Sequence, residues 1–334
     1  MSSKSSKAWP APAKLNLFLH ITGRRADGYH LLQTVFQFIN HCDWLYFTPR
    51  DDGVIRRLSE LPGVAPEHDL TVRAARLLQG YAPPACGVDI RLDKRLPMGG
   101  GLGGGSSDAA TTLVALNQLW GLHLPTEQLA ALGLQLGADV PVFIHGRAAW
   151  AEGVGEIMTP ITTLPEPWYV VIVPPCQVST HEIFSAPELT RDAPTLTIEG
   201  FLSPGRMPKC GERSLPVSLP PATLVLPCTS QDAQEPPAIC LGSSQWEGWG
   251  GSNVCEPVVG QRYPPVAAAL AWLRKQPGAV GTRMTGTGAC VFAAFADESS
   301  ARQVLQRLRR GYAEDAVEGM QGFVAKGMNR SPLY

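Results

Sequence analysis

Residues 97–110 contain the feature that most restricts how this chain can fold. They read Pro-Met-Gly-Gly-Gly-Leu-Gly-Gly-Gly-Ser-Ser-Asp-Ala-Ala, with six glycines in the seven positions 99–105. Such a run lets backbone N–H groups crowd around an anion, because no Cβ atom stands in the way. Apolar residues then recur at helical spacing and predict a helix over residues 107–120. The loop therefore meets a helix N-terminus, which favours negative charge, and Ser106 and Ser107 can cap that helix or contact phosphate and magnesium.

Three interpretations of this loop compete. A Walker loop is rejected, because no lysine follows the glycines. The dinucleotide-binding fingerprint matches literally at Gly99, Gly101 and Gly104. However, the preceding strand pattern carries charged residues at alternate positions, whereas the first strand of that fold is buried on both faces. A flexible linker is the third interpretation, and linkers rarely lie tightly between a strand and a capped helix.

The rest of the chain alternates strand and helix patterns without an internal repeat. Strands are predicted at residues 13–21, 31–39, 88–92, 168–173 and 322–326, a glycine turn with a strand at 284–295, and helices at 70–78, 127–136, 266–273 and 301–308. Several strands alternate between apolar and polar residues. This alternation favours an α+β fold with mixed or antiparallel sheets over a doubly wound parallel sheet.

Composition excludes several function classes. The 334 residues carry a formal net charge of −1, so the basic excess typical of proteins that bind nucleic acid or anionic lipid is missing. No apolar run approaches the roughly 18 residues of a membrane helix, and residues 1–7 lack the apolar core of a signal peptide, so we expect a cytoplasmic protein. The eight cysteines form no C-x-x-C pair, and no histidine lies at ligand spacing from a cysteine pair. We therefore expect free thiols and no protein-held metal site.

The glycine loop resembles the nucleotide loop of the galactokinase/homoserine kinase/mevalonate kinase/phosphomevalonate kinase superfamily. Four further stretches carry the resemblance: residues 12–17 with 23–30, residues 136–143, residues 285–292 and residues 322–327. Together they are most similar to the family of 4-diphosphocytidyl-2-C-methyl-D-erythritol kinases. The resemblance covers nearly the whole chain except residues 202–250, where eight prolines, five glycines and no sustained periodicity predict an irregular insertion.

The resemblance implies a nucleotide site that binds ATP together with Mg²⁺. The implied ATP-binding residues are Pro97, Met98, Gly99, Gly100, Gly101, Leu102, Gly103, Gly104, Gly105, Ser106 and Ser107. Gly286, Thr287 and Gly288 would otherwise be a tight turn, and the resemblance implies that they support the phosphate loop. Lys94 is expected near the adenine. Asp108 is interpreted as structural or metal-associated.

The resemblance also implies a catalytic pair, Lys14 and Asp139. Taken alone, Asp139 beside Pro141 is more typical of a turn or cap, and Lys14 of a solvated lysine. Phosphoryl transfer needs alignment, charge neutralisation and a group that accepts the hydroxyl proton. A lysine beside the acceptor oxygen favours the developing alkoxide, and a carboxylate takes the proton. The chemistry therefore agrees with the implied roles.

The acceptor site follows from the same resemblance. Tyr29 and His30 come after a hairpin-type turn and would otherwise be ordinary turn residues. The resemblance implies that Tyr29 stacks on a cytosine ring, that His30 hydrogen-bonds the edge of that ring and that Phe184 covers its other face. Asn16 and Thr180 match further substrate positions of the family.

The expected protein therefore has two α+β domains, residues 1–160 and 161–334, with the active site between them. The expected reaction is ATP-dependent phosphorylation of the 2-hydroxyl of 4-diphosphocytidyl-2-C-methyl-D-erythritol by a monomer or homodimer. Two alternatives remain open. One is a sibling kinase with a mevalonate-type or amino-acid hydroxyl acceptor, and the other is a ligand sensor that retains the fold without catalysis.

Overall fold

The computed structural model describes residues 7–202, 250–310 and 319–334. Apart from its two ends, the predicted insertion at 202–250 lies outside the described residues. The strands are β1 (Ala8–Arg24), β2 (His30–Arg50), β3 (Ile55–Arg57), β4 (Gly87–Asp93), β5 (Ala149–Glu152), β6 (Ile157–Pro160), β7 (Trp168–Val173), β8 (Val280–Met284), β9 (Val291–Phe295) and β10 (Gln321–Met328). The helices are α1 (Leu70–Gln79), α2 (Gly104–Leu119), α3 (Thr126–Leu134), α4 (Val140–His145), α5 (Thr180–Ser185), α6 (Ile198–Leu202), α7 (Glu256–Arg262), α8 (Pro264–Arg274) and α9 (Glu298–Arg309).

The described strands form one connected sheet. Its main path runs β3-β4-β2-β10-β7-β9-β8, while β1 and β5 also pair with β2, and β6 pairs with β5. The β3–β4 pair is parallel and the other pairs are antiparallel. The predicted α+β class with mixed strand pairing is therefore confirmed. Because β10 pairs with β2 on one side and β7 on the other, the sheet is continuous between the two halves of the chain.

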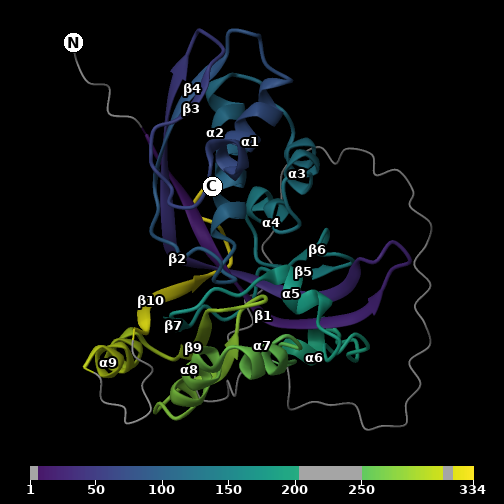
Figure 1. Ribbon diagram of the computed structural model, residues 1–334, viewed down its shortest axis with the longest axis vertical. Helices are drawn as coiled ribbons and strands as arrows, with labels where there is room; N and C mark the ends of the chain where they lie inside the picture. The colour runs from purple at the N-terminus through teal and green to yellow at the C-terminus, as the bar shows by residue number, and fades with distance from the viewer. Residues whose placement is uncertain (1–6, 203–249, 311–318) are drawn as a thin grey trace, which may run out of the picture.

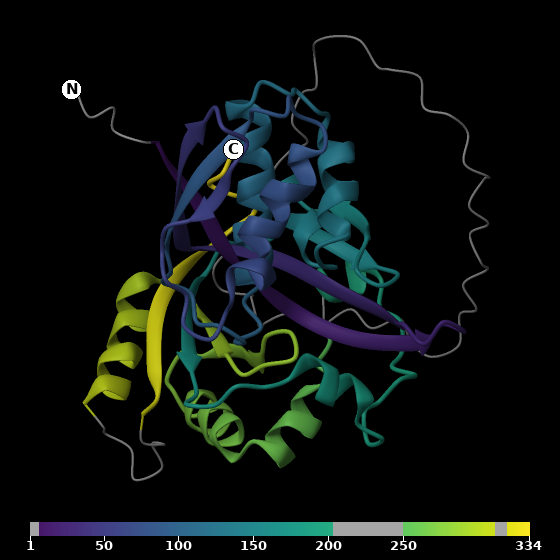
Figure 2. The ribbon, with the colours of Figure 1, turned by 45° about the horizontal axis from the view of Figure 1, so that its top comes forward.

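A long hairpin of β1 and β2 crosses the molecule and extends well beyond the predicted strands (Figure 2). Its register runs from Ala8 opposite Tyr46 to Arg24 opposite His30, with three irregularities. Residues 13–21 of β1 are buried without a break, so neither face of this part of the strand is open to solvent. The interior of β1 is therefore a place where a polar side chain can be held away from bulk water.

The helices gather in two groups on either side of this hairpin (Figure 1). Helices α1 to α4 lie with β1–β4, and α2 contacts both β1 and β2. Helices α7 to α9 lie with β7–β10, where α8 contacts β8 and β9, and α9 contacts β7 and β10. None of the described helices is long and apolar enough to cross a membrane.

Helix α2 begins three residues earlier than predicted, inside the glycine run. Its N-cap is Gly103, whose φ of +71° is a left-handed conformation that glycine adopts without a Cβ clash, and no side chain caps the helix. Of the two roles expected for Ser106 and Ser107, capping is therefore not observed, and contact with phosphate or magnesium stays a prediction. The first turn leaves its N–H groups without side-chain partners and free for an anion.

The described residues that flank the predicted insertion lie together. The N–H group of Gly250 donates to the carbonyl oxygen of Phe201 at 3.1 Å. The chain therefore leaves the fold after α6 and rejoins it at nearly the same point.

Candidate active site

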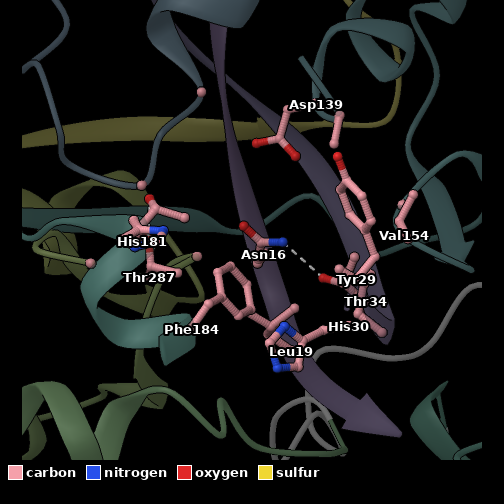
Figure 3. Close-up of a pocket in the computed structure, with 18 of the residues that line it drawn as sticks. Asn16, Leu19, Tyr29, His30, Thr34, Asp139, Val154, His181, Phe184 and Thr287 are labelled. Atoms are coloured by element: carbon pink, nitrogen blue, oxygen red, sulfur yellow. Dashed lines mark hydrogen bonds between the residues drawn. The ribbon is translucent and has the colours of Figure 1, made fainter. Parts of the chain in front are cut away.

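A cavity of about 910 Å³ brings together most of the predicted site residues. Its walls come from β1, β2, the glycine loop, the residue before α4, helix α5 and the turn at 286–288. In Figure 3, Asp139 lies at one end of the labelled residues, His30 and Phe184 lie at the other, and Asn16 lies between them. Catalytic and acceptor-site candidates that are far apart in the sequence thus share one space.

The predicted catalytic pair is in contact. The Nζ atom of Lys14 lies 3.2 Å from Oδ2 of Asp139. The same Nζ donates to Oδ1 of Asn16 at 2.5 Å and to the carbonyl oxygen of Gly101 at 3.1 Å. Lys14 is 2% exposed, so its position is fixed by these partners and by the packing of β1. The amino group of Lys14 is thereby held at the wall of the cavity.

Three further residues that sequence reasoning missed support the surroundings of this pair: Thr34 and Thr285 bond to partners of Lys14, and Asn253 bonds to residues beside Thr285. Thr34 accepts a hydrogen bond from Nδ2 of Asn16 at 2.9 Å, and this orients the amide so that its oxygen faces Lys14. Thr285 accepts from the backbone N–H of Asn16 and donates to the carbonyl of Gly101. Asn253 donates to the carbonyls of Met284 and Gly286. Thr285 lies in a motif segment and Asn253 lies just after the predicted insertion at 202–250, whereas Thr34 has no sequence signal.

The glycine loop fits against its neighbours because side chains are missing. A Cβ atom on Gly101 would lie 2.2 Å from the carbonyl oxygen of Thr285, and one on Gly103 would lie 2.9 Å from the ring of Phe143. The carbonyls of Gly99 and Gly100 accept hydrogen bonds from the N–H groups of residues 289 and 290. The backbone directly after the turn at 286–288, which was predicted to support the phosphate loop, is therefore hydrogen-bonded to the glycine loop. A second cavity of about 360 Å³ also borders this loop and is lined by Lys94, Pro97, Met98 and Asp108 as well as the glycines.

A buried ion cluster lies beneath the start of α2. The Nζ atom of Lys94 lies 2.6 Å from Oδ2 of Asp43 and 2.6 Å from Oδ2 of Asp108. Burial is the largest influence on Asp108 and raises the pKa of its carboxyl, while the charge of Lys94 opposes the rise. Among the described residues, Ser107 Oγ and Asp108 Oδ1 are buried oxygens without hydrogen-bond partners. Unpartnered oxygens beside the glycine loop are the ligand type that magnesium takes when its other ligands come from phosphate and water.

The acceptor end of the cavity contains a ring stack. The rings of His30 and Phe184 stack with centroids 5.2 Å apart and an interplanar angle of 24°. Tyr29 lines the same cavity but is 64% exposed. Thr180, at the start of α5, lies with its Oγ1 atom 2.9 Å from Oγ1 of Thr287. Helix α5 therefore joins the acceptor end to the turn at 286–288.

Arg191 is a further residue that sequence reasoning missed. Its Nε atom donates to Nε2 of His30 at 3.1 Å. Burial lowers the pKa of His30, and the positive charges of Arg191 and Arg24 lower it further. The imidazole is therefore held in its neutral form near neutral pH.

Comparisons with known proteins agree with this geometry. The GHMP kinases N terminal domain family matches residues 69–147, and the GHMP kinases C terminal family matches residues 238–314. A solved 4-(cytidine 5'-diphospho)-2C-methyl-D-erythritol kinase is 30% identical with a TM-score of 0.71, covering 96% of this chain and 99% of the other. A homoserine kinase structure from Cytophaga hutchinsonii, 17% identical with a TM-score of 0.65, covers 99% of this chain and 97% of the other and supports the fold alone.

Curated relatives are much more similar. The 4-diphosphocytidyl-2-C-methyl-D-erythritol kinase of Nitrosococcus oceani is 53% identical over 325 residues, which cover 97% of this chain and 96% of the relative. The kinase of the same name from Thiobacillus denitrificans is 52% identical and covers 98% of both chains. With a matching fold and nearly complete coverage in both directions, this chain belongs to the 4-diphosphocytidyl-2-C-methyl-D-erythritol kinase family.

Proposed function

We propose that this enzyme transfers the γ-phosphate of ATP to the 2-hydroxyl of 4-diphosphocytidyl-2-C-methyl-D-erythritol, with Asp139 as the proton acceptor. The observation that carries the proposal is the contact between Lys14 and Asp139 in a cavity bounded by the glycine loop and an aromatic acceptor end. A base, a cation and a phosphate-binding loop that converge in one space suit phosphoryl transfer to a hydroxyl.

The proposed reaction is a single displacement. The Asp139 carboxylate accepts the proton of the 2-hydroxyl as its oxygen attacks the γ-phosphorus. The bond between this phosphorus and the bridging oxygen breaks, and ADP leaves. Lys14 stabilises the negative charge that develops on the attacking oxygen, while backbone N–H groups of the loop and of α2 bind the phosphates. Ser107 and Asp108 are the side chains that would hold a Mg²⁺ ion, which would neutralise phosphate charge there.

Recognition of the acceptor rests on the other end of the cavity. Phe184 and Tyr29 supply the apolar faces that a cytosine ring needs, and His30 supplies a polar edge. Mevalonate-type and amino-acid acceptors have no base to stack on such rings, so this end of the cavity favours a cytidine-linked substrate. The proposed setting is a cytoplasmic enzyme, monomeric or homodimeric, without nucleic acid or membrane partners.

The test is a coupled assay of ADP release with purified protein, ATP, Mg²⁺ and 4-diphosphocytidyl-2-C-methyl-D-erythritol. Release that depends on the acceptor is the expected result. Release with mevalonate or homoserine instead would assign the chain to a sibling activity. Binding of ATP without release with any acceptor would favour a ligand sensor.

A further inference from the structure

Arg191 makes four directed contacts from one guanidinium group. Besides the bond from Nε to His30, Nη1 donates to the carbonyl of Leu189 at 3.0 Å. Nη2 donates to the carbonyls of Phe184 at 3.0 Å and Ala186 at 2.8 Å. These carbonyls lie at and beyond the C-terminal end of α5. Arg191 therefore holds both members of the ring stack, His30 by its side chain and Phe184 by its backbone.

The bond to His30 decides where the imidazole carries its proton. A guanidinium group is always charged and can only donate, so Nε2 of His30 must accept with a lone pair. The neutral ring then carries its proton on Nδ1. In the described part of the chain, Nδ1 has no hydrogen-bond partner, and His30 lines the cavity. His30 therefore brings one ring donor without a partner, Nδ1–H, to the lining of the acceptor site.

We infer that Arg191 is a positioning residue that sets the base specificity of the acceptor site by keeping the proton of His30 on Nδ1. This inference rests on the proposed function, because it concerns a pyrimidine bound beside His30. The N3 atom of cytosine is an acceptor with a lone pair, whereas the N3 atom of uracil carries a proton. A fixed Nδ1–H donor matches cytosine and opposes uracil, which would place two donors against each other.

The charged groups that act on His30 are Arg191, which follows α5, and Arg24, at the end of β1. Both are cations, and both disfavour the imidazolium form. Without Arg191, the neutral ring is free to carry its proton on either nitrogen, and its pKa rises, although burial and Arg24 still hold it below the ordinary value. Protonation then restores the Nδ1–H donor, because an imidazolium carries a proton on both nitrogens. The effect of losing Arg191 on cytidine preference should therefore depend on pH, whereas a general distortion of α5 should lower the preference at every pH.

The test compares binding of cytidine 5'-diphosphate and uridine 5'-diphosphate by calorimetry to the wild-type enzyme, Arg191→Ala and Arg262→Ala. Arg262 is the matched control, because its guanidinium bonds to Glu182 and Glu188 of the same region but not to His30. The expected result is that Arg191→Ala lowers the ratio of cytidine 5'-diphosphate affinity to uridine 5'-diphosphate affinity at least about tenfold at pH 8. This fold-change corresponds to the loss of about one hydrogen bond. Arg262→Ala keeps the wild-type preference.

Burial and Arg24 still lower the pKa of His30 in Arg191→Ala. Lowering the pH from about 8 to about 5, well below the ordinary pKa of histidine near 6.5, is therefore expected to restore the cytidine preference of this variant. An unchanged preference at pH 8, or a lost preference that does not return at pH 5, would overturn the inference. If Arg191→Ala does not fold, the ¹⁵N spectrum of the wild-type imidazoles decides the matter. A neutral His30 with its proton on Nδ1 supports the inference, and a proton on Nε2 refutes it. A wild-type enzyme that binds neither nucleotide would instead contradict the cytidine-linked acceptor of the proposed function.

Discussion

Lys14 Nζ lies 3.2 Å from Asp139 Oδ2, and the two side chains differ sharply in exposure, at 3% and 37%. The lysine belongs to the buried interior of β1, whereas the aspartate immediately precedes α4 and opens into the cavity. The cation is therefore fixed, and the carboxylate can reach an incoming hydroxyl. This division suits a base that must meet substrate and a cation that must not move.

Replacing Asp139 with Asn should lower kcat by about 10²- to 10⁴-fold, because the amide cannot accept the hydroxyl proton. Binding of ATP, measured by calorimetry, should change little, since the nucleotide contacts lie in the loop. Asp51→Asn, in the exposed turn after β2, is the control and should keep full activity. Undiminished turnover by Asp139→Asn would remove this residue as the base.

Gly101→Ala should weaken ATP binding at least about tenfold, because the new methyl group meets the carbonyl of Thr285 and displaces the loop. Gly121→Ala is the matched control, since Gly121 also has a positive φ but has open space around it. Both variants should lose about 1 kcal/mol of stability from backbone strain. Equal ATP affinities in the two variants would show that the close packing of the loop does not matter.

Phe184→Ala should raise the KM for the cytidine-linked acceptor by about 5- to 150-fold, as expected for the loss of one aromatic ring from a base stack. The KM for ATP should stay unchanged. Phe323→Ala removes a ring that stacks on His41 and does not line the cavity, so it controls for loss of an aromatic side chain. Steady-state kinetics with both substrates varied will distinguish the two variants.

The enzyme should lose stability as the pH falls below about 6.5, in part through His20. Its Nδ1 atom lies 2.9 Å from the carbonyl of Pro194, and its Nε2 accepts from the N–H of Ser252. Burial lowers the pKa of His20, and Arg283 lowers it too, against the opposing effect of the bond to Pro194. The neutral ring is thus favoured by folding, so its contribution is present above the unfolded pKa and is lost as the pH falls through the folded pKa.

Urea unfolding at about pH 5 and pH 8, on either side of the ordinary histidine pKa, will measure this contribution. His20→Gln should show a smaller loss of unfolding free energy between the two pH values than the wild-type protein. His68→Gln, at an exposed site, should retain the wild-type loss. A His20→Gln protein with the full wild-type loss would contradict the prediction.

Removing residues 203–249 and joining Leu202 to Gly250 should leave a folded and active enzyme. The hydrogen bond from Gly250 to Phe201 shows that the flanking residues are already adjacent, so closing this connection requires little movement. Thermal unfolding and the ADP-release assay will check both expectations. A folded shortened protein that binds ATP but does not turn over would show that the removed residues contribute to catalysis.

The elements with strong periodicity were predicted well from the sequence. Strand β7 has the predicted bounds, and α1, α8 and α9 lie where apolar residues recur at helical spacing. Strands β3, β5 and β6 have three or four residues each, too few to show a period, and they were missed. Helix α2 begins at Gly104 rather than at residue 107, because contacts of the loop with Thr285 and Phe143 hold glycines in a conformation that local propensity does not favour.

The candidate site was predictable where motifs carry it. Lys14, Asp139 and the turn at 286–288 came from segments that resemble one kinase family, and the structure brings them together. Local sequence alone predicted that Asp139 is a turn or cap residue and that Lys14 is a solvated lysine. Thr34 and Arg191 were missed for a physical reason, since each matters through a tertiary contact, and Arg191 reaches a residue 161 positions away. No local pattern records such a contact.

The position of β10 at the end of the chain has a consequence for folding during synthesis. This strand is the last of the described chain, yet it pairs with both β2 and β7. A nascent chain that ends before residue 321 therefore presents two open strand edges, which are sites for wrong pairing. The sheet is completed only when a segment nearly 300 residues downstream reaches β2, so folding depends on contacts that are distant in sequence and slow to form.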